Sequence, residues 1–174
     1  MIDKLFYYIG SFGPLILFIY SLILLWNKQN LFFYYIIGFF LDSIINLILK
    51  GFFQQPRPSE DPVLFNIALK NGKRFVFKDY IPHDIFGMPS GHAQSTFFST
   101  VFIYLSIQNI NVFNFYLFIS LMTIIQRVIY DFHTVFQVII GSFIGCILGY
   151  GFYYLARQKM KGLIREKPEE FAPQ

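Results

Sequence analysis

Five long apolar runs limit what this chain of 174 residues can fold into. Each is close to the roughly 20 residues that an α-helix needs to cross the hydrocarbon core of a bilayer. Inside that core, only helices and closed barrels satisfy every backbone polar group. The runs cover residues 9–27, 31–50, 92–109, 112–130 and 134–156. We therefore predict an all-α fold, a multi-pass transmembrane bundle of about five spanning helices.

The composition supports a membrane protein and limits the classes of partner that we expect. Charged residues make up 14% of the chain, against about 25% in soluble domains. The net charge of +4 comes without the basic and aromatic pattern of a nucleic-acid binder, so we expect membrane lipids and no nucleic acid as partners. The single cysteine, Cys146, excludes a disulfide framework within the chain. The N-terminus has no basic region or cleavage site, so the first run is expected to remain as a helix.

One long polar segment, residues 51–90, joins the second and third runs, and its prolines exclude a continuous helix. The pair Asn71-Gly72 favours a type I′ turn between two apolar stretches. We therefore predict a small hairpin, formed by residues 65–69 and 74–77, that lies over the membrane surface.

The remainder is interpreted as a single membrane domain over residues 1–156 with a basic and acidic tail over 157–174. Basic residues in short loops and helix flanks gather on the face of Lys28 and this tail, which the positive-inside rule assigns to the cytoplasm. The face that carries the long loop would then be lumenal or extracytoplasmic, in the endoplasmic reticulum or the plasma membrane.

Polar and glycine stripes mark two of the predicted helices. Asp42, Asn46 and Lys50 follow one another at a spacing of four, which places them on one helical face. Ionisable groups within a membrane usually face the bundle interior, although a purely structural polar stripe is the alternative for Asp42 and Asn46. For Asp42 we hypothesise a supporting role behind the site, through pairing with polar groups of the last helix. That helix carries glycines at 141, 145 and 149, which would let another helix approach closely.

Three polar clusters fall on one predicted membrane face, at the ends of the apolar runs. They are Lys50 with Arg57, then Pro89-Ser90-Gly91-His92, then Arg127 with His133. Lysine and arginine suit an anion with several oxygens, and a helix that begins at Ser90-Gly91 offers amide donors to phosphate. Two histidines suit a nucleophile and a general acid. No carboxylate cluster has metal-ligand spacing, so we expect no metal and no other cofactor.

The three clusters, in this order and with a long loop between the first two, resemble the signature motifs of the type 2 phosphatidic acid phosphatase (PAP2) superfamily. The resemblance covers about residues 42–150. It implies a helical bundle that hydrolyses phosphate esters or diphosphates without a metal, through a phosphohistidine intermediate. By the same resemblance His133 would be the nucleophile and His92 the general acid. The residues that it assigns to phosphate binding are Lys50, Arg57, Ser90, Gly91 and Arg127.

Two positions depart from the usual pattern of the superfamily. Gln126 stands where a serine is common, and Gln137 where an aspartate often orients the histidine. A glutamine oxygen can accept the Nδ1–H bond of His133 and fix its tautomer, but it supplies no charge. The spacing of His133 and Gln137 is similar to the dolichyldiphosphatase and glucose-6-phosphatase branches. The stretch 87–94 favours the former, and hence a lipid phosphate or a polyprenyl diphosphate of dolichyl or undecaprenyl type as substrate.

Two other functions stay open at this point. The missing aspartate would suit a non-catalytic protein that binds lipid phosphate or acts as a scaffold, and a soluble sugar phosphate is the other candidate substrate. Five spans are fewer than the six of many relatives, so a neighbouring copy in a homo-oligomer could supply a helix. The remaining polar residues near the clusters are interpreted as structural. Asp84 is expected to be a solvated loop acid, Asp131 to point away from His133, and His83 to have no catalytic role.

Overall fold

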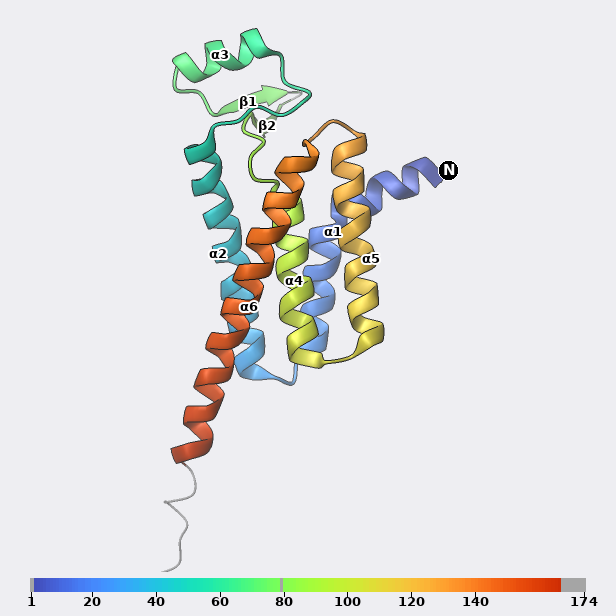
Figure 1. Ribbon diagram of the computed structural model, residues 1–174, viewed down its shortest axis with the longest axis vertical. Coiled ribbons are helices and arrows are strands. Elements are labelled where there is room, and N and C mark those ends of the chain that lie inside the picture. The colour runs from blue at the N-terminus through green and yellow to red at the C-terminus, as the bar shows by residue number, and fades with distance from the viewer. Residues whose placement is uncertain (1, 79, 167–174) are drawn as a thin grey trace, which may run out of the picture.

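The computed structural model describes residues 2–78 and 80–166, which form six helices and two short strands (Figure 1). In chain order the elements are α1 (Ile2–Leu25), α2 (Gln29–Phe53), α3 (Pro62–Lys70), β1 (Phe75–Lys78), β2 (Ile81–Asp84), α4 (Gly91–Ile107), α5 (Ile110–Ile129) and α6 (Val135–Glu166). The helices α1, α2, α4, α5 and α6 run lengthwise as a bundle, and α3 with the β1–β2 hairpin lies over one end of it. We call this end the site end. The all-α membrane fold is confirmed.

Four helices in the described part of the chain are long and apolar enough to cross a membrane, namely α1, α2, α5 and α6. The fifth predicted span is α4, which has 17 residues and contacts all four others. Because its neighbours shield it from lipid, α4 can be shorter and more polar than they are. Buried serines and threonines along it bond within the bundle; Ser99, for example, bonds to Tyr35 at 2.8 Å.

The outer surfaces of the spanning helices are apolar. The exposed side chains there include Leu15, Ile19, Ile23, Ile44, Ile48, Phe143 and Ile147. In water such a continuous apolar surface would be a liability, whereas in a bilayer it contacts lipid tails. Inside, a core of aromatic residues that includes Tyr35, Phe98 and Phe102 fills the half of the bundle away from the site end.

The glycine stripe of α6 brings that helix against the backbone of α4. A Cβ atom at Gly141, Gly145 or Gly149 would overlap the carbonyl oxygen of a residue on α4 or at its N-cap. The predicted close approach is therefore confirmed, with α4 as the partner helix. It places Ser90, at the start of α4, directly against α6.

The predicted hairpin of residues 65–69 and 74–77 is wrong in its first strand. Residues 62–70 form α3, because the Asp61 carboxylate caps the helix by accepting bonds from Val63 N and Leu64 N at 2.8 and 2.9 Å. Proline at the first helical position also favours this start. Asn71-Gly72 therefore ends a helix. The hairpin forms further on, where β1 and β2 pair antiparallel with Phe75 opposite Asp84.

Both terminal helices are longer than the apolar runs suggested. α1 begins at Ile2 and continues through Pro14, with its first turns leaning away from the bundle (Figure 1). α6 continues past residue 156 to Glu166, so the first part of the predicted tail is helical. Residues 167–174 of that tail lie outside the described residues.

Candidate active site

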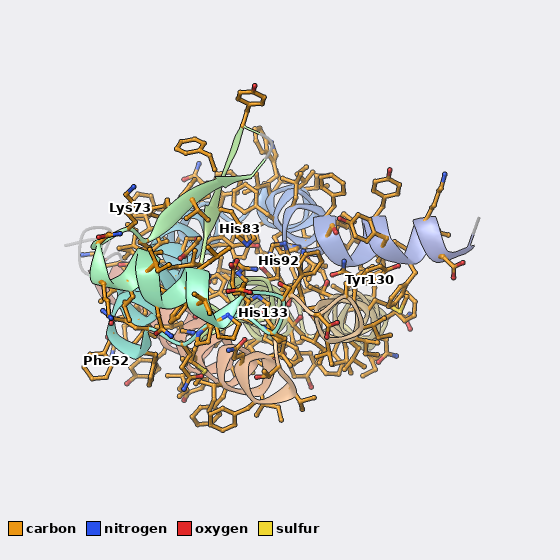
Figure 2. The ribbon with its side chains drawn as sticks, turned by 90° about the horizontal axis from the view of Figure 1, so that it is seen from above. Phe52, Lys73, His83, His92, Tyr130 and His133 are labelled. Atoms are coloured by element: carbon orange, nitrogen blue, oxygen red, sulfur yellow. The ribbon has the colours of Figure 1, made fainter. Side chains whose placement is uncertain are left out.

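The three motifs meet at the site end of the bundle. Lys50 lies in the last turn of α2, Ser90 to His92 at the start of α4, Arg127 in the last turn of α5, and His133 just before α6. Figure 2 looks down on this end and shows His92 and His133 near the centre of the bundle. The charges of Lys50, Arg57 and Arg127 act on both histidines. The structure therefore brings together the clusters that the sequence separates.

His133 is buried, and its ring is held by hydrogen bonds at one nitrogen. Nδ1 lies 2.8 Å from the carbonyl oxygen of Gly87 and 3.3 Å from Oε1 of Gln137. A carbonyl oxygen can only accept, so Nδ1 carries the proton and Nε2 keeps its lone pair. The backbone N–H of His133 donates to the carbonyl of Arg127 at 3.1 Å, which fixes the turn between α5 and α6.

Gln137 belongs to a capping box at the start of α6. Its backbone N–H donates to Thr134 Oγ1, and its side-chain Oε1 accepts from Thr134 N, both at 3.2 Å. Its Nε2 donates to the carbonyl of Pro56 at 3.0 Å, which sets the orientation of the amide. The sequence Thr-x-x-Gln is a known signal for this cap. It accounts for a glutamine at position 137, where an aspartate is more usual in the superfamily. Gln137 thus orients His133 and also connects the first motif to α6.

Gly87 is the orienting residue that the sequence interpretation missed. A Cβ atom there would lie 2.7 Å from Gln137 Oε1 and 2.9 Å from the carbonyl of Pro56. Only glycine leaves room for the three segments to meet. The backbone N–H of Gly87 also donates to the carbonyl of Gln55 at 2.7 Å, so the loop before α4 runs beside the first motif.

Burial lowers the pKa of His133 to about 3, and the positive charges of Arg57, Lys50 and Arg127 act in the same direction. The hydrogen bond that Gln137 Oε1 accepts acts in the opposite direction, but it does not outweigh burial and the positive charges. Since the pKa lies below the usual value of about 6.5, the ring is neutral at physiological pH in the absence of an anion.

This shift predicts how His133 titrates. In the protein without substrate, we expect the ring to stay neutral down to about pH 5, because protonation would place a further positive charge among three cations. A pH titration of histidine-labelled protein by NMR, assigned with the His133→Gln variant, would measure the midpoint. A midpoint near 6.5 would contradict the described environment.

The two cations of the first motif are held by the last residue of β2, Asp84, and by Phe86 just after it. Lys50 donates to the carbonyl of Phe86 at 3.0 Å and lies 3.4 Å from Oδ2 of Asp84. Arg57 donates through Nε to the backbone carbonyl of Asp84 at 3.0 Å. This bond uses only Nε, so the two Nη groups of Arg57 are not committed by it.

Arg127 is a buried cation, 7% exposed. Its guanidinium lies 4.8 Å from the centre of the Phe132 ring. Within residues 2–78 and 80–166, its Nε has no hydrogen-bond partner and no carboxylate pairs with it. A buried, unpaired positive charge is costly, so this position favours an anionic ligand.

Ser90 occupies the N-cap position of α4 without capping it. Its backbone N–H donates to the carbonyl of Gln137 at 3.1 Å and is not free for a ligand. Its hydroxyl is buried and has no partner among the described residues. The sequence predicted backbone N–H donors for phosphate at the start of α4, and that of Ser90 is not available for this purpose. Its hydroxyl group can still donate to a ligand. Gly91 lies beside Asn46, whose Oδ1 would be 3.0 Å from a Cβ at that position.

Asp42 lies deeper in the bundle and bonds to α4. Its Oδ1 accepts from Gln94 Nε2 at 2.9 Å, and its Oδ2 from Ser95 Oγ at 3.1 Å. Asn46 Nδ2 donates to Gln94 Oε1 at 2.9 Å and to the Pro89 carbonyl at 3.3 Å. The expected pairing with the last helix is thus wrong; the partner is α4. The chain of bonds still reaches the second motif, which supports the hypothesis of an indirect role for Asp42.

Asp84 and Arg74 are the other residues that the sequence interpretation missed. The Asp84 side chain is 12% exposed and binds Arg74 through two bonds of 3.0 and 3.2 Å, so the expected solvated acid is wrong. Burial alone would raise the pKa of Asp84, but hydrogen bonds from Arg74 and the charge of Lys50 outweigh it and keep the pKa below its usual value. The sequence does contain a signal for this role of Asp84. The motifs are rich in basic residues, and such residues need an acidic partner nearby.

Asp84→Asn should weaken substrate binding, because the neutral side chain no longer holds Lys50 in place. If the protein has the phosphatase activity that the motif resemblance implies, we expect the KM for phosphate release to rise about tenfold, with kcat changed less than about threefold, since Asp84 does not contact His133. Steady-state kinetics would measure both. The control is Asp131→Asn, at an exposed residue with φ 53° that asparagine tolerates. A fall in kcat alone would contradict this prediction.

A bundle of membrane-length helices that gathers three cations and two histidines at one end defines a polytopic membrane protein with a site for an anion. More specifically, the chain belongs to the PAP2 superfamily, whose family model matches residues 31–161. This confirms the resemblance seen in the motifs.

The chain is also similar to a curated relative, the dolichyldiphosphatase of Saccharomyces cerevisiae (strain ATCC 204508 / S288c). The two are 27% identical over 140 residues, an alignment that covers 74% of this chain and 51% of the relative. The chain therefore spans about half the length of that protein. No solved structure matches the chain.

Proposed function

We propose that this protein is a membrane-embedded phosphatase that acts without a metal on a polyprenyl diphosphate of dolichyl type, through a phosphohistidine at His133. Membership of the PAP2 superfamily and the name of the yeast relative support the reaction and the substrate class. The observation that carries the proposal is a buried, neutral His133 whose Nδ1–H is engaged and on which three cations act.

In the proposed reaction the terminal phosphate is bound by Lys50, Arg57 and Arg127, with the Ser90 hydroxyl as a further donor. The lone pair on His133 Nε2 attacks phosphorus, and the bond to the leaving oxygen breaks. His92 donates a proton to that oxygen. Water then attacks phosphorus and gives a proton to His92, the bond between phosphorus and His133 Nε2 breaks, and inorganic phosphate leaves.

His92 has a bond that bears on its proposed role. Its Nε2 lies 3.2 Å from the backbone carbonyl of Ser11 on α1, so this nitrogen carries a proton. Nδ1 is then the nitrogen that gains a proton in the imidazolium. A bound phosphate would favour that form, because its negative charge offsets the nearby cations.

A cavity of about 460 Å³ beside His92 supports a lipid substrate. It lies between α1 and α2 and reaches Gly91 and His92, while Pro14, Leu15 and Phe39 supply apolar lining. A hydrocarbon chain in this cavity would remain in apolar surroundings while its phosphate reached the histidines. A soluble sugar phosphate would gain nothing from such a lining.

The test is phosphate release by the purified protein from dolichyl diphosphate, undecaprenyl diphosphate, phosphatidic acid and glucose 6-phosphate, each with and without EDTA. We expect the polyprenyl diphosphates to be the best substrates, EDTA to have no effect, and vanadate to inhibit by mimicking pentacoordinate phosphorus. A requirement for Mg²⁺ would contradict the mechanism. A preference for glucose 6-phosphate would contradict the substrate class.

The second candidate is a non-catalytic protein that binds lipid phosphate. It is favoured by Gln137, which orients His133 without lending it charge. Saturable binding of a polyprenyl diphosphate without phosphate release in any of these assays would establish this function instead. For either function we propose that the site end faces the lumen or the extracytoplasmic side.

A further inference from the structure

A second polar cavity lies at the end of the bundle opposite the candidate active site. It has a volume of about 560 Å³. Its lining comes from the turn between α1 and α2 and the start of α2 (together residues 27–31), from Ser106 near the end of α4, and from Arg157 on α6. Three segments far apart in the sequence therefore meet there, and none of them carries a catalytic motif.

The lining is positively charged and has no acidic residue. Lys28 is exposed and donates to the backbone carbonyl of Ser106 at 3.3 Å. Arg157 is exposed too, and no hydrogen bond or ion pair joins it to another residue of the described part of the chain. The amide side chains of Asn27, Gln29 and Asn30 complete the polar lining. Two cations beside neutral hydrogen-bond donors suit an anion with several oxygens.

Ser106 gives an independent indication of a ligand. Its hydroxyl oxygen is buried, yet it has no hydrogen-bond partner among residues 2–78 and 80–166. Serine hydroxyls within helices usually bond to a carbonyl one turn earlier, as Ser99 and Ser142 do here. A buried polar group without a partner calls for an explanation, and a rotation of the side chain that turned the hydroxyl into the cavity would let a ligand oxygen provide one.

The cavity lies at the level where lipid headgroups are found. It adjoins the loop between two membrane-length helices, α1 and α2, and Arg157 lies near the end of the span of α6. Trp26, next to the lining, is 72% exposed. Exposed tryptophans gather at the membrane–water interface, and basic pockets between membrane helices at that level suit lipid headgroups.

We propose that this cavity binds the phosphate of an anionic phospholipid headgroup, in the leaflet opposite the candidate active site. Lys28 and Arg157 bind the phosphate oxygens, and the Ser106 hydroxyl donates to one of them. The bound headgroup joins α6 to the turn between α1 and α2. It should therefore stabilise the bundle without taking part in phosphate release.

The test uses the full chain in a neutral detergent, titrated separately with dioctanoyl phosphatidylglycerol, dioctanoyl phosphatidylcholine and inorganic phosphate. Native mass spectrometry measures bound lipid, and the thermal melting midpoint measures stabilisation. We expect phosphatidylglycerol to bind and to raise the midpoint more than either other probe. Lys28→Gln and Arg157→Gln should each weaken it about fivefold, and the double variant about 25-fold.

The matched control is Lys159→Gln, because Lys159 is exposed on α6 but lies two residues from Arg157 and so on another face of the helix. We expect it to change the affinity less than twofold. An equal loss in this variant would show diffuse attraction to surface charge and would overturn the site. Inorganic phosphate that bound as tightly as phosphatidylglycerol would overturn the assignment to a lipid.

Ser106→Ala separates binding from folding. Without lipid it should melt at the same temperature as the parent protein or higher, because the unpartnered hydroxyl is gone. With phosphatidylglycerol it should gain less stability than the parent protein. A variant that gained as much as the parent would show that Ser106 does not contact the ligand, and would overturn its place in the site.

Discussion

Replacing His133 with alanine should reduce phosphate release at least about 1,000-fold. The substitution removes the only nitrogen that can attack phosphorus in the proposed mechanism, while Lys50, Arg57 and Arg127 remain to bind substrate. The loss should therefore appear in kcat more than in KM. Release of phosphate from dolichyl diphosphate would measure it, and brief incubation with substrate labelled in its terminal phosphate should yield labelled protein only when His133 is present.

The control for this experiment is His83→Ala. His83 lies in β2 and belongs to none of the three motifs; its Nε2 lies 3.3 Å from Oε1 of Glu60. We expect that variant to keep the parent activity within about threefold. His133→Ala protein that eluted as folded material and still released phosphate at the parent rate would refute the proposed nucleophile.

Arg127→Met should lower kcat/KM about 100- to 1,000-fold, since a buried cation no longer stabilises the charge that develops on the phosphate. The same change should leave the protein without substrate as stable as before, or more stable. The reason is that Arg127 is buried without a carboxylate partner among the described residues, and methionine fills a similar volume without the charge. We therefore expect kcat/KM to fall while the melting midpoint stays the same or rises.

Arg74→Met provides the contrast. Arg74 binds Asp84 through two bonds, so its removal leaves a carboxylate that is 12% exposed with fewer partners. We expect that variant to melt at a lower temperature than the parent, and its activity to fall with the loss of Lys50 placement. If Arg127→Met also lowered the melting midpoint strongly, Arg127 would have a structural partner, and its assignment to phosphate binding would fail.

The sequence predicted the spans and the motif residues because both depend on side-chain type and spacing. The stripe of Asp42, Asn46 and Lys50 is buried as its spacing of four implied, and the glycines of α6 do meet another helix. In each case the pattern lies within one helix, where geometry follows directly from residue number.

What the sequence did not predict depends on contacts between segments distant in the chain. The acceptor for His133 is a backbone carbonyl at Gly87, and every residue has such a carbonyl, so composition gives no signal for it. The pairing of Asp84 with Lys50 joins β2 to α2. It depends on the hairpin of β1 and β2, whereas the sequence predicted a hairpin that does not include Asp84. The signals for the start of α3 and for the cap of α6 are local, however, and the sequence does contain them, as Asp61-Pro62 and Thr134-x-x-Gln137.

The contact between α4 and α6 has a consequence for the spacing of the two histidines. His92 lies in the first turn of α4, and His133 precedes α6. Between these helices, the glycines at 141, 145 and 149 let main chain contact main chain. The separation of the two helix axes is thus set by the thickness of the peptide backbone, which no rotamer change can alter. The glycines therefore set the distance between His92 and His133. A methyl group added at one of them would push α4 and α6 apart and would widen the space between the two histidines, although every motif residue would be unchanged.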